Sequence, residues 1–133
     1  MTISWLFADE STEAVQGVMA RVAEAGAMVP SLWRLEVANV LRGAIRRGRC
    51  DEAFADASLA RLRRMPIAID DETDLHAWGR TRDIAHVEDL TVYDAAYLEL
   101  AMRLGVGVAS NDAALIAAAR RNGVEVITTD SRR

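Results

Sequence analysis

The chain has 133 residues, of which 51% are hydrophobic and 27% charged, with a formal net charge of −4. This length and composition exclude a disordered chain and predict one folded domain over residues 1–133. The acidic balance argues against unspecific binding of nucleic acid through the whole surface.

In chain order, the hydrophobic periodicity predicts helices separated by short apolar strands. Residues 11–25 have apolar side chains at helical spacing, and the apolar segment 27–30 follows them. The further helices expected are 32–47, 51–64, 73–84, 91–104 and 112–121, and the strands are 67–70, 106–109 and 124–128. This alternation is typical of parallel βαβ units, so we expect an α/β fold with a central parallel sheet.

No apolar run approaches the roughly 18 residues that a membrane-spanning helix needs. The opening segment "MTISWLFADE" has no basic leader and does not resemble a signal peptide. The single cysteine, Cys50, excludes an intramolecular disulfide and suits a reducing compartment. We therefore expect a cytoplasmic protein that does not enter a membrane.

Three carboxylates stand in surroundings that otherwise resemble a core: Glu36, Asp94 and Asp112. Most other acids, Asp70 among them, fall at helix starts or on polar faces, and at a helix start the helix dipole stabilises a negative charge. Each of the three also has a structural explanation. Thr91 and Asp94 fit a capping box, Asp112 fits a helix N-cap, and Glu36 fits partial exposure or a pair with a distant arginine.

Taken together, the three acids predict a metal site. Parallel strands bring the residues that follow them to one edge of the sheet, where like charges need a positive centre. Oxygen ligands favour Mg²⁺ or Mn²⁺, and such a site suits hydrolysis of a phosphodiester. A Gly-rich phosphate loop and a nucleophile elbow are both absent from the sequence, and His76 and His86 fit surface positions. A metal-dependent phosphohydrolase that acts on small phosphoesters stays open as an alternative.

The segments "VPSLWRLEVANVLRGAIRRGR", "LTVYDAAYLELAMRLGVGVASNDAALIAAARRNGVEVI" and "SWLFADE" resemble PIN domains, specifically VapC-like toxins of type II toxin–antitoxin systems. The resemblance implies a dimeric, metal-dependent ribonuclease on an α/β/α sandwich, silenced by a small VapB-like antitoxin. It also implies that Glu36, Asp94 and Asp112 bind Mg²⁺ or Mn²⁺ and carry catalysis on RNA. By the same resemblance, Ser110 and Asn111 support the site.

One departure from the family pattern has consequences for the site and the sheet. The family's first strand, which ends in "D-x-S", would fall just before Met1, so we expect the chain to lack that strand and its acid. Metal affinity should then be weaker than in a four-acid site. The sheet should contain an unpaired edge or an open slot, which another chain could fill. A catalytically inactive PIN-fold module for binding or dimerisation is the alternative function.

All sixteen basic residues are arginine. Arg42, Arg46, Arg47 and Arg49 gather near the end of the helix that carries Glu36, where they could contact RNA phosphates or acidic residues of an antitoxin. The structural alternative is that these arginines lie on a solvated face, where their positive charge interacts favourably with the C-terminal end of the helix dipole. Trp33 and Trp78 fit core or dimer contacts better than base stacking.

Overall fold

A computed structural model of the chain describes residues 13–127, with side chains from residue 16 onward. Helices and short strands alternate along it. In order they are α2 (Glu13–Ala25), β1 (Ala27–Val29), α3 (Trp33–Arg46), α4 (Glu52–Arg63), β2 (Ile67–Ile69), α5 (Thr73–His76), α6 (Arg80–Glu88), α7 (Val92–Leu104), β3 (Val108–Ala109), α8 (Ala113–Arg121) and β4 (Val126–Ile127). The predicted α/β class is confirmed.

One predicted helix is wrong in its bounds. Residues 73–84 form two helices rather than one, because the chain turns before Gly79, whose φ of −109° and ψ of −103° lie outside the helical region. The second of them, α6, then continues to Glu88, four residues past the expected end. It ends at Asp89 in the left-handed conformation, which aspartate tolerates better than most residues.

The strands form two separate pairs instead of the single central sheet that the sequence predicts. β1 pairs with β2 in parallel, with Ala27 opposite Ile67, and β3 pairs with β4 in parallel, with Val108 opposite Val126. Within residues 13–127 no strand joins the two pairs. A cavity of about 1020 Å³ is lined by residues of both β1 and β3.

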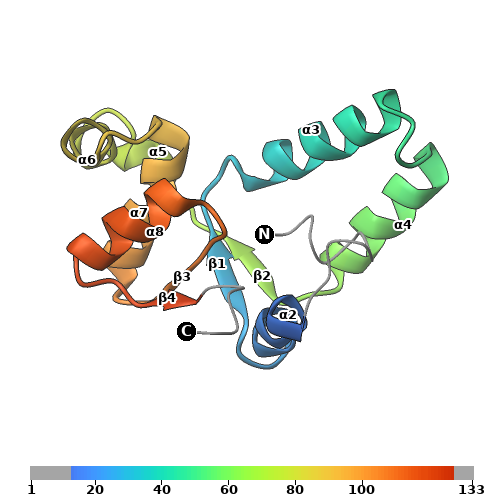
Figure 1. Cartoon of the computed structure of the whole chain (residues 1–133), viewed down its shortest axis with the longest axis horizontal. Helices are drawn as coiled ribbons and strands as arrows, with labels where there is room; N and C mark the ends of the chain where they lie inside the picture. Colours follow the sequence, from blue (N-terminus) through green and yellow to red (C-terminus); the bar gives the residue numbers. More distant parts are fainter. Residues whose placement is uncertain (1–12, 128–133) are drawn as a thin grey trace.

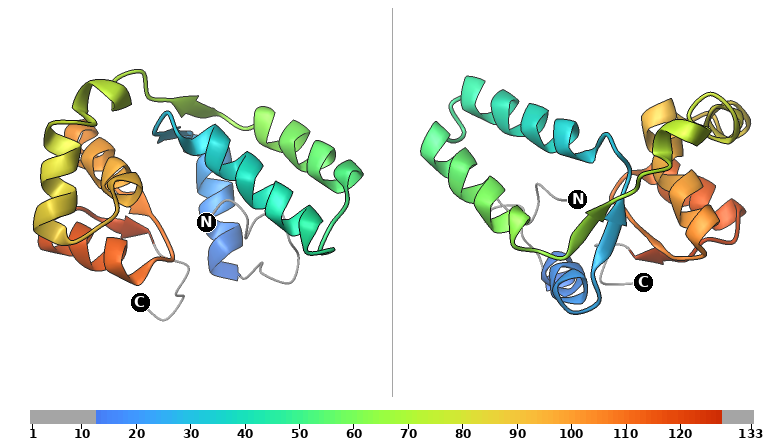
Figure 2. Two further views of the ribbon diagram at one scale, coloured as in Figure 1. Left: turned by 90° about the horizontal axis from the view of Figure 1, so that it is seen from above. Right: turned by 180° about the vertical axis from the view of Figure 1, so that it is seen from behind.

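The chain folds into two lobes on either side of this cavity (Figures 1 and 2). The N-terminal lobe contains α2, α3, α4 and the β1–β2 pair, and its core includes Val18, Val37, Leu41 and Leu62. The C-terminal lobe contains α5 to α8 and the β3–β4 pair, and its core is built around Leu98, at 0% exposure, on α7. Burial of these side chains supplies the main stabilisation within each lobe.

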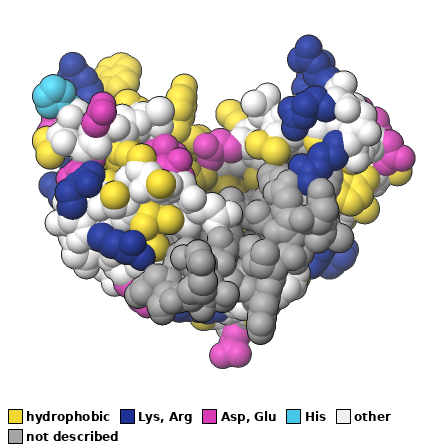
Figure 3. Space-filling view, in the orientation of Figure 1, with side chains coloured by type: hydrophobic (Ala, Val, Ile, Leu, Met, Phe, Trp, Pro, Cys, Tyr) yellow, Lys and Arg dark blue, Asp and Glu magenta, His cyan; other side chains and the backbone are white. Residues whose placement is uncertain are grey.

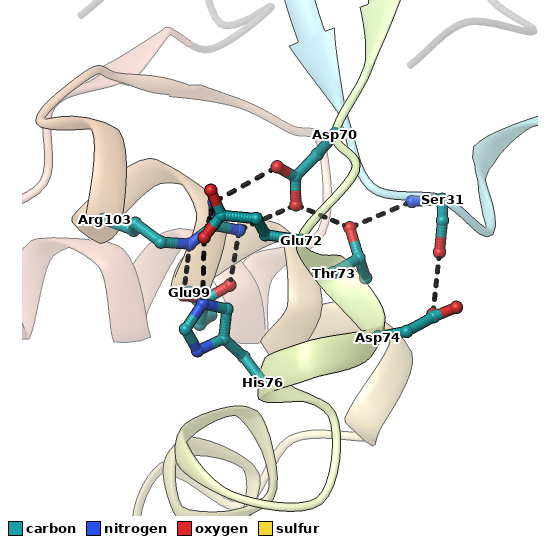
Figure 4. A network of polar contacts seen from close by, with 8 residues as sticks. All are labelled: Ser31, Asp70, Glu72, Thr73, Asp74, His76, Glu99 and Arg103. Carbon is teal, nitrogen blue, oxygen red and sulfur yellow. Dashed lines mark hydrogen bonds and ion pairs between the residues drawn. The ribbon is translucent and has the colours of Figure 1, made fainter.

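A buried ion-pair network joins α7 to the end of β2 (Figure 4). The Arg103 guanidinium donates to Asp70 Oδ2 at 2.7 Å and to Glu99 Oε2 at 2.8 Å. The Thr73 hydroxyl donates to Asp70 Oδ2 at 2.7 Å and accepts a hydrogen bond from the Ser31 backbone N–H at 3.1 Å. Asp70 is therefore a buried ion-pair partner that fixes one lobe to the other, and its assignment to an ordinary helix start was wrong.

Candidate active site

The three carboxylates singled out in the sequence line the same cavity, together with Ser110 and Asn111. Glu36 lies in the first turn of α3, which follows β1, and Asp94 lies in the first turn of α7. Asp112 follows β3 directly and is the N-cap of α8. The chain therefore brings these acids to one cavity from three different helices, two of which begin just after parallel strands. Figure 3 shows the hollow between the lobes, with acidic side chains beside it.

Glu36 is held by a tyrosine from the other lobe. The Tyr97 hydroxyl on α7 donates a short hydrogen bond to Glu36 Oε1. Burial, followed by this hydrogen bond and the negative charge of Glu36, raises the pKa of Tyr97 well above its usual value. The hydroxyl therefore stays protonated and remains a donor, which fixes the position of the carboxylate it contacts.

Asp94 carries negative charge in a half-buried position. Burial raises the pKa of its carboxyl group, and the charge of Asp112 raises it further, while Thr91 acts in the opposite direction. Thr91 caps α7, since its hydroxyl oxygen accepts a hydrogen bond from the Asp94 backbone N–H at 3.0 Å. The cap that the sequence predicts is therefore present, but it leaves the repulsion between the two aspartates in place.

Asp112 combines a structural contact with a place in the cavity. Its Oδ2 accepts a hydrogen bond from the Leu115 backbone N–H at 2.9 Å, as expected of an N-cap. The buried Ser110 hydroxyl oxygen accepts a hydrogen bond from the Asp112 backbone N–H at 2.9 Å. Ser110 thus fixes the turn that carries Asp112, and Asn111 between them is exposed.

The donor set has the chemistry of a site for a hard divalent cation. Three carboxylates line one cavity, and both the burial of Asp94 and the neighbouring charge of Asp112 raise the pKa of Asp94, which a bound cation would oppose. However, in residues 13–127 no three acidic, histidine or cysteine side chains are close enough together to form a ready metal cluster. The residues fit the cation chemically, and binding would require the acids to draw closer.

The arginines of α3 surround a second, shallow hollow of about 300 Å³. Arg42, Arg46 and Arg47 line it and are exposed, and Arg49 is exposed in the turn after the helix. At 1.5 Å per residue along a helix, the Cα atoms of Arg42 and Arg46 lie about 9 and 15 Å from that of Glu36 along the axis of α3. Figure 3 shows arginines over the arm formed by α3 and α4.

Two long-range contacts in the structure were not predicted from the sequence. The spacing of three residues between Asp94 and Tyr97 places both on one face of α7, but nothing local shows that the Tyr97 hydroxyl reaches Glu36. Glu99 and Arg103 have the i, i+4 spacing of an ion pair, but nothing local shows that Asp70 completes it.

Trp78 is predicted from the sequence to lie in a core or dimer contact. In this chain its side chain is 92% exposed, so it is not a core residue.

Comparison with known proteins gives the family. No helix within residues 13–127 is long and apolar enough to cross a membrane. No curated protein and no solved structure is significantly similar to the chain. The family model for the PIN domain matches residues 2–132, which is nearly the whole sequence, and this chain therefore belongs to the PIN-domain family.

Proposed function

We propose that this protein is a metal-dependent endoribonuclease of the VapC-like toxin type, with Glu36, Asp94 and Asp112 as its metal ligands. PIN domains are generally nucleases that use divalent ions such as Mg²⁺ or Mn²⁺. The finer assignment to VapC-like toxins is supported by the motifs around Glu36 and around Asp94 to Asp112.

The observation that carries the proposal is the shared cavity of the three carboxylates. An ordinary capping acid faces solvent or a backbone amide, whereas Asp94 is half-buried, and this burial, followed by the charge of Asp112, raises the pKa of its carboxyl group. Such an arrangement destabilises the metal-free fold and is typical of a functional site. A cation between the acids would turn this repulsion into attraction.

The chain's own residues would position the metal ligands and bind the RNA. When bound, the cation would activate a water molecule and offset the charge that develops on the phosphate. Tyr97 holds the Glu36 carboxylate by its hydroxyl, and Ser110 holds the turn before Asp112. Arg42 and Arg46 lie on the same helix as Glu36, toward its C-terminal end, where they would bind phosphates of the RNA strand on one side of the cleavage point.

The partners proposed are a VapB-like antitoxin and a second copy of the chain, in the cytoplasm. Exposed apolar side chains on α5, α6 and α7 support a protein partner, because Leu75, Val87 and Tyr93 are each at least 66% exposed. The arginines of α3 offer a second surface, complementary to acidic residues of an antitoxin.

A catalytically inactive PIN-fold binding module is the second candidate. It is supported by the spacing of the acids, which within residues 13–127 do not form a ready metal cluster. Such a module would keep the fold and the exposed apolar surface but would cleave no RNA.

Cleavage of a mixed cellular RNA pool with Mn²⁺ or Mg²⁺ separates the two candidates. We expect the wild type to cut and EDTA to stop it, and we expect Asp94→Asn and Asp112→Asn to reduce cleavage at least about 100-fold, as is typical when groups that act together are removed. Asp56→Asn, an exposed acid on α4, is the matched control and should cut as the wild type does. If wild-type protein is folded and cuts nothing, the binding module is favoured; if it cuts p-nitrophenyl phosphate alone, the small-phosphoester alternative is favoured.

A further inference from the structure

The shallow hollow on α3 gathers positive charge without an acidic partner. The part of the chain that the structure describes contributes no acid to its lining, which consists of Asn39, Val40, Arg42, Gly43, Arg46 and Arg47. Within residues 13–127, none of these three arginines forms an ion pair. Arg42 and Arg46 are four residues apart on the helix, where like charges repel. The helix dipole accounts for arginines in the last turn but not for Arg42, so an anion in the hollow is the better explanation of the cluster.

Gly43 leaves room in this hollow for a guanidinium group. It lies inside α3, where glycine is the least favourable residue apart from proline. A Cβ atom at this position would lie 3.2 Å from Nη1 of Arg47, which is closer than ordinary van der Waals contact. The missing side chain therefore lets the Arg47 guanidinium fold back over the helix beside the hollow. An arginine that served the helix dipole alone would not need a glycine there.

The hollow adjoins the cavity that the three carboxylates line. Val40 lines both, and its side chain is 40% exposed. Glu36 and Gly43 are seven residues apart, close to two helical turns, so they lie on the same face of α3. Arg47, the C-cap, follows eleven residues after Glu36, close to three turns. Since α3 runs outward from the centre of the molecule (Figure 1), a strand that leaves the carboxylates along this face reaches the hollow.

We propose that the hollow is a second phosphate subsite, in which Arg42, Arg46 and Arg47 bind a backbone phosphate of the RNA strand that is cleaved at the carboxylates. The inference rests on the proposed nuclease function and deepens it, because it fixes the path of the substrate along α3. Guanidinium groups match phosphate oxygens in pairs of hydrogen bonds. RNA is favoured over an acidic protein segment because the hollow adjoins the candidate metal ligands along one face of the helix.

Binding of a fluorescein-labelled dodecamer of uridine in EDTA tests the subsite without cleavage. We expect Arg47→Met to weaken binding about tenfold at low salt, because a hydrogen bond between charged groups is lost. The slope of log affinity against log salt concentration should fall by about 0.7, the value for one phosphate contact on a single strand. Arg82→Met removes an exposed arginine of α6 in the other lobe and is the control, which should bind as the wild type does.

Gly43→Leu gives a sharper test because it changes no charge. Leucine would occupy the hollow and displace the Arg47 guanidinium, so we expect the same loss of affinity and of salt dependence as in Arg47→Met. Leucine is a much better helix former than glycine, so the variant should unfold a few degrees higher than the wild type. Gly17→Leu is the matched control, since Gly17 is exposed on α2 and a Cβ there meets no atom within 4 Å. It should raise the unfolding temperature without weakening RNA binding.

RNA cleavage with Mn²⁺ by the same proteins separates this inference from the nuclease. If the wild type cuts RNA while Gly43→Leu and Arg47→Met bind and cut equally well, the subsite is wrong and the nuclease stands. If the wild type cuts nothing but both variants lose binding in EDTA, the nuclease is wrong and the subsite stands.

Three results in EDTA would overturn the proposal. A folded wild type that does not bind the RNA has no such subsite. Weaker binding in Arg47→Met but not in Gly43→Leu would show that Arg47 acts only through its general charge. Binding of fluorescein-labelled hexaglutamate instead of the RNA, with the same dependence on Arg47, would assign the hollow to an acidic protein segment.

Discussion

Replacing Arg103 by methionine should strongly destabilise the fold, because it leaves two buried carboxylates without their cation. The Arg103 side chain is 19% exposed, while those of Asp70 and Glu99 are 5% and 2% exposed. Removing one partner of a buried ion pair costs about 3–5 kcal/mol. We expect about 3 kcal/mol, the low end, because water reaches part of the guanidinium. For a chain of this size that lowers the unfolding temperature by about 10–15 °C.

The pH dependence of the unfolding free energy tests the ion pair between Asp70 and Arg103 in a second way. The Arg103 hydrogen bond holds the pKa of Asp70 at about 2, below its usual value of 3.8. A depressed pKa contributes stability that is present above pH 3.8 and lost as the pH falls toward 2. In Arg103→Met, the burial of Asp70 is no longer opposed by the guanidinium, so the pKa of its carboxyl group is higher than in the wild type and the group takes up a proton at a higher pH. The difference in unfolding free energy between wild type and variant should therefore narrow from pH 7 to pH 4.

Urea unfolding of wild type, Arg103→Met and Arg121→Met at pH 7 and pH 4 measures these differences. Arg121→Met is the matched control, since it removes an ion pair to Glu88 from an arginine that is 56% exposed, where solvent screens the pair and its loss should cost little. The triple variant with Asp70→Asn, Glu99→Gln and Arg103→Met should recover part of the loss. If Arg103→Met costs no more than Arg121→Met, the network does not hold the lobes together.

Three further predictions concern single residues. Tyr97→Phe removes the donor to Glu36 and should weaken Mn²⁺ binding, measured by calorimetry, with a stability loss of only about 1 kcal/mol; unchanged Mn²⁺ affinity would exclude a positioning role. Asp94→Asn should stabilise the metal-free protein slightly at pH 7 and less at pH 4, because a raised pKa destabilises the fold as the pH rises through it and solvent screens part of this effect; thermal unfolding at both pH values checks this. Asp51→Ala removes the N-cap of α4, whose side chain accepts from the Phe54 N–H at 2.8 Å, and should cost about 1 kcal/mol, whereas Asp56→Ala on the same helix should cost little.

The helices could be predicted from the sequence where the spacing of apolar residues and the residues that mark helix ends agreed. Helix α3 has its apolar side chains Val37, Leu41 and Ala44 buried on one face, as the spacing predicts. The end of α7 follows from Gly105, whose φ of 67° only glycine adopts without strain. The break before Gly79 was missed, since an isolated glycine in a helical pattern predicts a break only weakly.

The site was predictable in its acids but not in the contacts that hold them. Parallel strands bring the residues that follow them to one edge, so the placement of Asp112 beside the cavity follows from topology. The Tyr97 contact with Glu36 spans 61 residues, and the Arg103 pair with Asp70 spans 33. Such pairs depend on how the lobes pack, which periodicity does not encode. The split of the sheet into two pairs within residues 13–127 is likewise a tertiary property.

The central claim is that Glu36, Asp94 and Asp112 form a cation site, and Mn²⁺ titration by calorimetry tests it most directly. The account predicts one saturable Mn²⁺ site in the wild type and in Asp56→Asn. It predicts loss of that site in Asp94→Asn and in Asp112→Asn, with all four proteins folded. At a pH low enough for Asp94 to be partly protonated, binding should also release protons, seen as a heat that depends on the buffer. Equal Mn²⁺ affinity in all four proteins, or no binding to the folded wild type, would contradict the account.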